Sequence, residues 1–212
     1  APVPGSATDE FAKSFFETYM TTGKGGTGDN SALVASLVSE AKTRVAEKVS
    51  TSYQSSSVRT VPGTSVASYA AAIETALLDN QVPDDARDAT SVIDAYISKE
   101  DSSQKKNLLA IAAAYKGIAS DLSLAVVPPE LAATHLSFLR SADLTSKAVA
   151  AIAEYETDPL TTVGAIGIYQ SATIELGSAL QSVGTALMTQ GEPAPGTPGA
   201  LIMSIIRSNG AL

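Results

Sequence analysis

Apolar residues recur every three or four positions along most of this chain, a spacing typical of one buried face of an α-helix. Candidate caps, prolines and glycines separate the apolar stretches from one another. The pattern predicts helices over about residues 8–22, 31–49, 65–80, 91–99, 103–124, 129–154 and 160–188. The expected fold is therefore all-α, a multi-helix bundle of about six or seven helices.

The starts of these helices carry recognisable side chains. The residues that can cap the earlier helices are Thr8, Asn30 or Ser31, Thr64 or Ser65, and Ser102 or Ser103. The two later helices begin at proline corners, Pro128-Pro129 and Asp158-Pro159, where the missing N–H of proline costs nothing. We expect these corners to produce long antiparallel C-terminal helices.

One segment departs from the helical pattern. Residues 50–64 are rich in Ser and Thr, and Val58-Arg-Thr-Val-Pro-Gly63 is typical of a short extended run closed by a turn. We expect at most one short strand or hairpin near 58–62.

The composition favours closely packed helices. Hydrophobic residues make up 44%, charged residues 17% and aromatic residues 5%, so Ala, Leu, Val and Ile must build most of the core. We divide the chain into a disordered leader or linker (1–7), a single helical domain (8–190), a Pro/Gly linker (191–199) and an apolar C-terminal segment (200–212).

The apolar C-terminal run Ala200-Leu-Ile-Met-Ser-Ile-Ile206 is too short to span a bilayer. We expect it either to dock onto the bundle or to form an assembly contact, because exposed apolar segments mark interaction surfaces. The candidate interaction residues are Leu201, Ile202, Met203, Ile205 and Ile206.

Four glycines, at positions 164, 167, 177 and 184, lie inside the last predicted helix, where each costs about 1 kcal/mol relative to alanine. Close approach of a neighbouring backbone explains such glycines, and a functional hinge is the alternative.

The net charge of −8 disfavours a nucleic-acid partner, because proteins that bind phosphates concentrate Lys and Arg on one face. The absence of cysteine excludes disulfides, thiolate metal sites and cysteine nucleophiles. The most apolar stretch, 108–127, is interrupted by Lys116 and Asp121, so a membrane contact is expected only through an anchor not present in this chain. The start at Ala1 looks processed, which indicates export.

Two polar segments share residue types with ligand-binding loops but lack their spacing. Residues 22–31 are glycine-rich yet follow a helix and lack the P-loop order, so a flexible connection is favoured over a phosphate site. The acidic residues of 79–88 lack the spacing of a calcium loop, so helix capping is favoured over calcium binding. We expect no cofactor and no metal.

His135 is the single histidine and lies beside the apolar positions Leu131 and Phe138. Because no cysteine or second histidine accompanies it, a hydrogen-bonded histidine at the edge of the core is favoured over a metal ligand. The alternative is a pocket between helices, formed by His135, Tyr115, Tyr155 and Tyr169.

Several segments together resemble a known domain. They are Lys116-Gly-Ile-Ala-Ser-Asp-Leu, Val127-Pro-Pro-Glu-Leu-Ala-Ala-Thr-His-Leu, Asp158-Pro-Leu and Ile168-Tyr-Gln170, together with the helix start Glu10–Tyr19. Over about residues 8–188 the chain is similar to a helical domain of uncharacterised envelope-associated proteins of Patescibacteria, candidate-phyla bacteria with very small genomes. The resemblance implies an exported or membrane-tethered domain and attaches no catalytic role to any residue.

No nucleophile elbow or other catalytic constellation is present in the sequence. We therefore expect a non-enzymatic, extracytoplasmic protein that acts in a cell-surface assembly such as a pilus, a type IV secretion apparatus or an adhesion module. Its expected partners are envelope proteins or further copies of itself. The alternative is a ligand-binding or hydrolytic module with its site near His135.

Overall fold

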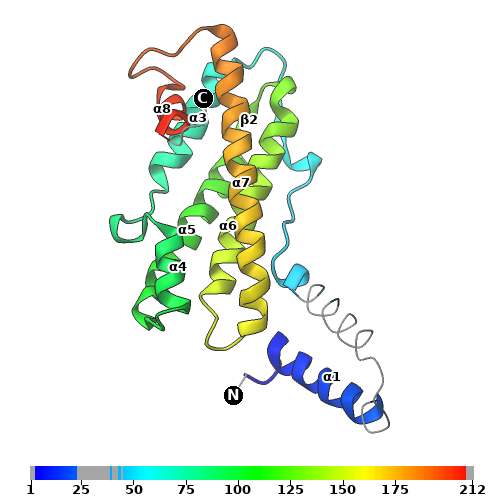
Figure 1. Cartoon of the computed structure of the whole chain (residues 1–212). Coiled ribbons are helices and arrows are strands. Elements are labelled where there is room, and N and C mark those ends of the chain that lie inside the picture. The colour runs from blue at the N-terminus through cyan, green and yellow to red at the C-terminus, as the bar shows by residue number, and fades with distance from the viewer. Residues whose placement is uncertain (1–2, 23–38, 40–42, 44, 209–212) are drawn as a thin grey trace.

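The chain folds as an all-α multi-helix bundle, as the sequence predicts (Figure 1). This computed structural model describes residues 3–22, 39, 43 and 45–208. The glycine-rich segment after residue 22 and most of the predicted helix over 31–49 lie outside the described residues. Residues 45–48, at the end of that prediction, are helical.

Three helices form the long axis of the bundle. They are α5 (Lys105–Leu122), α6 (Ala132–Ile152) and α7 (Pro159–Gln190), which run antiparallel to one another in chain order (Figure 1). Shorter helices surround them: α3 (Val66–Asp79) and α4 (Ala89–Ile97) pack on α5, and α8 (Ala200–Ser208) packs on α3 and α7. Helix α1 (Ala7–Thr22) meets the N-terminal end of α7.

Two short strands join distant parts of the chain. Strand β1 (Arg59–Thr60) lies where the sequence predicts an extended run, and it pairs in parallel with β2 (Val126–Val127). The sequence analysis did not predict β2. The residue before a proline is driven to extended geometry, which puts Val127 into a conformation that can pair.

Single-turn 3₁₀ helices form the remaining corners of the described bundle. They are η2 (Ser55–Ser57), η3 (Asp84–Ala86), η4 (Ser102–Gln104) and η5 (Pro129–Leu131). The double proline places η5 directly before α6, as the corner prediction requires.

Capping side chains confirm some predicted helix starts and correct others. Ser65 and Asp158 cap α3 and α7 as expected, each by accepting a backbone N–H three residues on. Thr8 does not cap α1, because Ser6 accepts the N–H of Asp9 instead. Asp101, rather than Ser102 or Ser103, accepts the N–H that begins η4.

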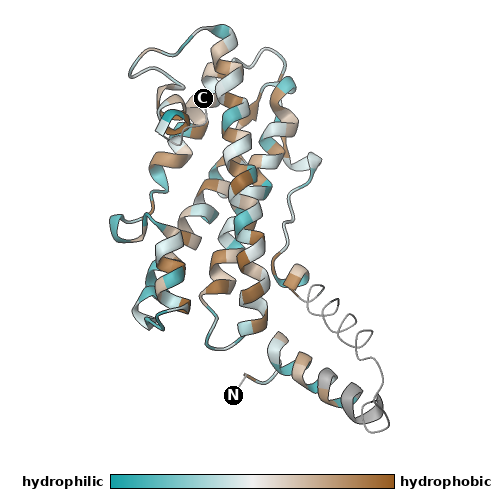
Figure 2. Cartoon of the chain, viewed as in Figure 1, coloured by the Kyte–Doolittle hydropathy of each residue, from teal (hydrophilic) through white to brown (hydrophobic). Residues whose placement is uncertain are grey.

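The core divides into two clusters along the bundle. One joins α3, α8 and the C-terminal end of α7, and centres on Tyr69 and Phe138. The other joins α4, η3 and the N-terminal end of α7, and centres on Leu108 and Ile152. Helices α5 and α6 run through both, and Tyr115 packs against both. Figure 2 shows hydrophobic residues along the bundle helices and hydrophilic residues in the loop between α3 and α4.

The glycines of α7 face side chains or open space, which corrects the prediction that a neighbouring backbone approaches them. A Cβ on Gly164 would meet Val45, and one on Gly184 would meet Ile206. In the described part of the chain nothing lies within 4 Å of a Cβ built on Gly167 or Gly177. Two of the four glycines therefore have no explanation inside the described bundle.

Among the described helices, none combines the length and the apolar character needed to cross a membrane.

Candidate functional site

His135 lies completely buried beside Tyr69, in the core cluster that joins α3, α8 and the C-terminal end of α7. Its Nδ1 is 2.9 Å from the hydroxyl of Tyr69, which is also fully buried, and the two rings meet edge to face. Among the described residues Nε2 has no hydrogen-bond partner of normal geometry. The favoured sequence interpretation placed His135 at the edge of the core, whereas the structure places it inside.

Burial decides the charge of this pair. Desolvation lowers the pKa of His135 to about 4, although the nearby carbonyl of Leu122 favours the protonated form. Desolvation also raises the pKa of Tyr69, so its hydroxyl keeps its proton and can donate to Nδ1. The pair is a neutral hydrogen bond inside the core, with no access for a substrate.

The three tyrosines proposed to share a pocket with His135 do not gather around it. Tyr155 and Tyr169 pack against the other core cluster, which joins α4, η3 and the N-terminal end of α7, and Tyr155 meets Tyr96 edge to face. His135 lies near the start of α6 while Tyr155 follows its end, a separation of about 25 Å along the helix at 1.5 Å per residue. Tyr115 lies between the two clusters. The four residues therefore do not form one pocket.

A second concentration of polar groups surrounds Asp158, where the starts of α1 and α7 converge. Its Oδ1 accepts from Thr8 N–H at 3.1 Å, Thr8 Oγ1 at 2.7 Å and Thr161 N–H at 3.4 Å. Its Oδ2 accepts from Ala7 N–H at 3.2 Å, Lys48 Nζ at 2.5 Å and Thr161 Oγ1 at 2.8 Å. One buried carboxylate thus caps two helices that lie 150 residues apart.

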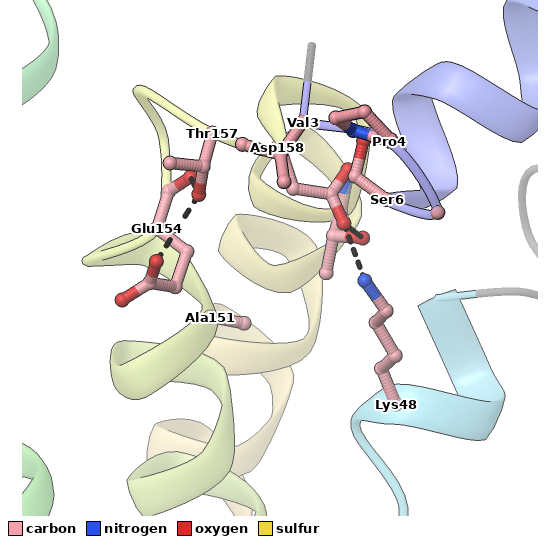
Figure 3. A pocket seen from close by; sticks show the side chains of 10 residues that line it. Val3, Pro4, Ser6, Lys48, Ala151, Glu154, Thr157 and Asp158 are labelled. Atoms are coloured by element: carbon pink, nitrogen blue, oxygen red, sulfur yellow. Dashed lines mark hydrogen bonds and ion pairs between the residues drawn. The ribbon is translucent and has the colours of Figure 1, made fainter.

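Thr8 completes this junction from the α1 side, since its Oγ1 accepts the N–H of Leu160 at 3.0 Å. A hollow of about 440 Å³ lies beside the junction, between the N-terminal residues and the end of α6. Figure 3 shows Lys48 pointing at Asp158, while Glu154 and Thr157 pair with each other on the turn after α6.

The Asp158 carboxylate is committed to holding the fold. Burial favours its protonated form, but Lys48, Thr8 and Thr161 outweigh burial and leave its pKa well below the ordinary value. Both oxygens accept several hydrogen bonds, so neither is placed to take a proton from a ligand in the hollow. Sequence reasoning identified Asp158 as a cap for α7 but not its partners in α1.

The apolar C-terminal segment docks within the chain as α8. Ile202, Met203 and Ile206 are buried against α3 and α7, whereas Leu201 and Ile205 are only partly covered. Glu74 on α3 holds the start of α8 by accepting the N–H groups of Leu201 and Ile202. Of the five candidate interaction residues, two therefore keep surface that a partner can reach.

The outward side of α7 is the clearest exposed apolar feature of the described bundle. Val163, Ile174 and Met188 are 69%, 71% and 44% exposed. At 100° per residue these three side chains fall within about 40° of one another around the helix. The same line contains exposed Gly167, Gln170, Gly177 and Gln181, and we call these seven residues the α7 outer face.

This face is uncharged for its whole length. Among the 32 residues of α7 the sequence has one charged side chain, Glu175, which lies about 120° around the helix from Val163. Beside Gly177 the face is hollowed, and a depression of about 520 Å³ opens between α7 and α8. The depression is lined by Ile174, Leu180, Ile205 and Ile206. Its lining therefore continues from the α7 outer face onto Ile205 of α8.

No group of three or more His, Cys, Asp or Glu side chains suited to a metal ion occurs among the described residues. Comparison of the chain with protein-family models, with curated proteins and with solved structures finds no match. The functional argument therefore rests on the sequence and the geometry of the chain itself.

The α7 outer face was missed in the sequence analysis although part of its pattern is visible there. Val163, Ile174 and Met188 follow one another at intervals of 11 and 14 residues, which are close to three and four helical turns. The more regular heptad-like spacing in the same helix belongs to the inward positions Leu176, Leu180, Val183 and Leu187. The absence of charged residues on the opposite side of the helix would have identified the α7 outer face.

Proposed function

We propose that this chain is a non-enzymatic, extracytoplasmic helical protein that acts as an interaction component of a cell-surface assembly. The observation that carries the proposal is the α7 outer face. An exposed, uncharged face that spans about 37 Å of helix is unusual on a protein with a net charge of −8.

The side chains most suited to catalysis support the same proposal, because their hydrogen bonds are made to other residues of the fold. The single histidine is sealed in the core with Tyr69, and the most enclosed carboxylate, Asp158, caps two helices. The extracytoplasmic and cell-surface part of the proposal rests on the sequence alone, through the resemblance to envelope-associated domains.

The alternative function, a ligand-binding or hydrolytic module near His135, is not favoured. Neither hollow described above is lined by His135, and the three tyrosines named with it lie elsewhere.

Site-specific photocrosslinking in the native cells tests the proposal. A photoreactive residue replacing Ile174 is expected to give a discrete product with a protein of the cell envelope, and mass spectrometry identifies that protein. The same residue at Leu124 is the matched control, because Leu124 is 76% exposed but lies between α5 and β2. A chain that is absent from the envelope fraction, or that gives no product at Ile174, contradicts the proposal.

A further inference from the structure

The α7 outer face matches itself when it is turned end to end. Val163 and Met188 are equally far from the point between Glu175 and Leu176, and so are Ile174 and Gly177. In an antiparallel pair with its two-fold axis at that point, Ile174 of one copy faces Gly177 of the other. Val163 of each copy then faces Met188 of its neighbour.

In this pairing a large side chain of one copy faces unoccupied space on the other copy. Gly177 lies in the depression between α7 and α8, and nothing described occupies the space that its side chain would fill. Ile174 is 71% exposed and projects from the same face. A knob facing a hole at each of two symmetric positions is how packed helix pairs interlock.

The glycines supply a second reason for a close neighbour. Gly167 and Gly177 each cost about 1 kcal/mol relative to alanine in a helix, and neither has a positive φ or a described contact that requires glycine. A second helix packed along this face would account for both glycines, because a missing side chain lets helix backbones approach closely.

Charge favours a second copy as the occupant. Two chains with a net charge of −8 repel one another, and the uncharged α7 outer face is a surface on which they can meet without adding close contacts between like charges. Glu175 lies at the flank, about 120° from the line of Val163. The neutral side chains Gln170 and Gln181 fall at the same level in the two copies.

We infer that the α7 outer face binds a second copy of this chain in an antiparallel, two-fold symmetric pair, with Ile174 of each copy seated beside Gly177 of the other. A two-fold interface uses the same patch on both subunits, as this self-matching pattern requires. The inference rests on the proposed function, because it names the partner of the surface that carries that proposal.

Disulfide crosslinking tests the pairing directly, because the natural chain has no cysteine. Two full-length variants, Val163→Cys and Met188→Cys, are mixed, equilibrated and oxidised. The pair places these two positions opposite each other, and a disulfide needs Cα atoms within about 7 Å. Like positions in the two copies are about 37 Å apart along the helix, so each variant alone is expected to stay uncrosslinked.

The expected result is a disulfide that joins residue 163 to residue 188, found only in the mixture and identified by the mass of the joined peptides. Crosslinking of each variant with itself indicates parallel pairing and overturns the inference. Leu124→Cys, at a position 76% exposed, controls for random collision.

Sedimentation velocity supplies the second readout. Ile174→Lys places a charge beside the depression in both copies and is expected to weaken dimer formation at least about tenfold, whereas Leu124→Lys leaves it unchanged. A natural chain that stays monomeric to about 100 µM, well above the micromolar range of ordinary association, overturns the inference. If Ile174 still gives an envelope crosslink in cells, the proposed function survives with a different partner.

Discussion

Glu74 on α3 accepts hydrogen bonds from the backbone N–H groups of Leu201, at 2.8 Å, and Ile202, at 3.3 Å. The first turn of α8 is thus closed by a carboxylate more than 120 residues earlier in the chain. Asp158 does the same for α1 from the bundle corner before α7. Both terminal helices are therefore anchored at their N-terminal ends, where a negative charge is most favourable.

Replacing Glu74 with alanine tests the anchor of α8. Glu74→Ala leaves two N–H groups of α8 without their acceptor, and we expect it to lower the free energy of unfolding by about 1 kcal/mol. Hydrogen exchange over residues 200–208 is expected to accelerate. Asp79→Ala, in the last turn of the same helix, is the matched control. Unchanged exchange in α8 would show that its apolar contacts hold it without Glu74.

Replacing Asp158 with alanine tests the shared cap. Because one carboxylate serves the starts of both α1 and α7, we expect Asp158→Ala to lower the free energy of unfolding by about 2–3 kcal/mol, more than an ordinary cap loses. Limited proteolysis within α1 is expected to become faster. Ser65→Ala, which removes a cap from α3 alone, provides the comparison. Equal losses in the two variants would contradict a double role for Asp158.

The buried His135 predicts a specific dependence of stability on pH. Its pKa of about 4 in the folded chain lies below the ordinary 6.5, so the unfolded chain binds more protons between these values. The free energy of unfolding is therefore expected to fall as pH falls through this window, by up to about 3 kcal/mol. Denaturant unfolding between pH 7 and 4 measures this slope.

Two features separate this effect from that of the carboxylates. The lowered pKa of Asp158 makes its contribution present above about pH 4 and lost only below that value. The glutamine of His135→Gln can still pair with Tyr69, but its side chain does not titrate. A slope in this variant as steep as in the natural chain would assign the dependence to other groups.

A glycine of α5 makes room for a side chain of the neighbouring connection. A Cβ on Gly117 would lie 1.7 Å from Oδ1 of Asn80, whose amide nitrogen donates to Ala76 and Asp121. We expect Gly117→Ala to lower the free energy of unfolding by about 1–3 kcal/mol, despite the better helix propensity of alanine. In the double variant with Asn80→Ala the two losses are expected to be less than additive, and strict additivity would contradict the clash.

Thr145 carries a buried hydroxyl without a hydrogen-bond partner among the described residues. Thr145→Val keeps the shape of the side chain and removes the unpaired oxygen, so we expect the free energy of unfolding to rise by about 1 kcal/mol. Thermal unfolding measures the change. Ser146→Ala is the opposite case, because its hydroxyl donates to Ala112 at 2.7 Å, and it should lower stability. A lower stability in Thr145→Val would indicate a partner for that hydroxyl.

The sequence predicted most of the helices because their evidence is local. Ser65 and Asp158 cap helices where a polar oxygen precedes an apolar run, and Pro129 and Pro159 mark corners by a restriction confined to neighbouring residues. The short strand at Arg59–Thr60 was also visible as a local extended run.

The pairings that give these elements their roles were not local, and the sequence analysis missed them. Thr8 is a plausible cap by type, yet Ser6 caps α1 while Thr8 accepts a hydrogen bond from α7. The hydrogen bond between Tyr69 and His135 was not predicted, because the two residues lie 66 positions apart and meet only in the folded bundle. Residue type predicts what a side chain can do, and tertiary packing selects the partner.

The shared cap at Asp158 constrains the order in which the helices become fixed during synthesis. During synthesis α1 emerges from the ribosome before the other helices of the bundle, but the carboxylate that closes its first turn is 150 residues away. Helix α1 therefore lacks that cap while α3, α5 and α6 are translated. The cap can form only after the corner before α7 has formed. Helix α1 is therefore translated before α3, α5 and α6 but capped after them.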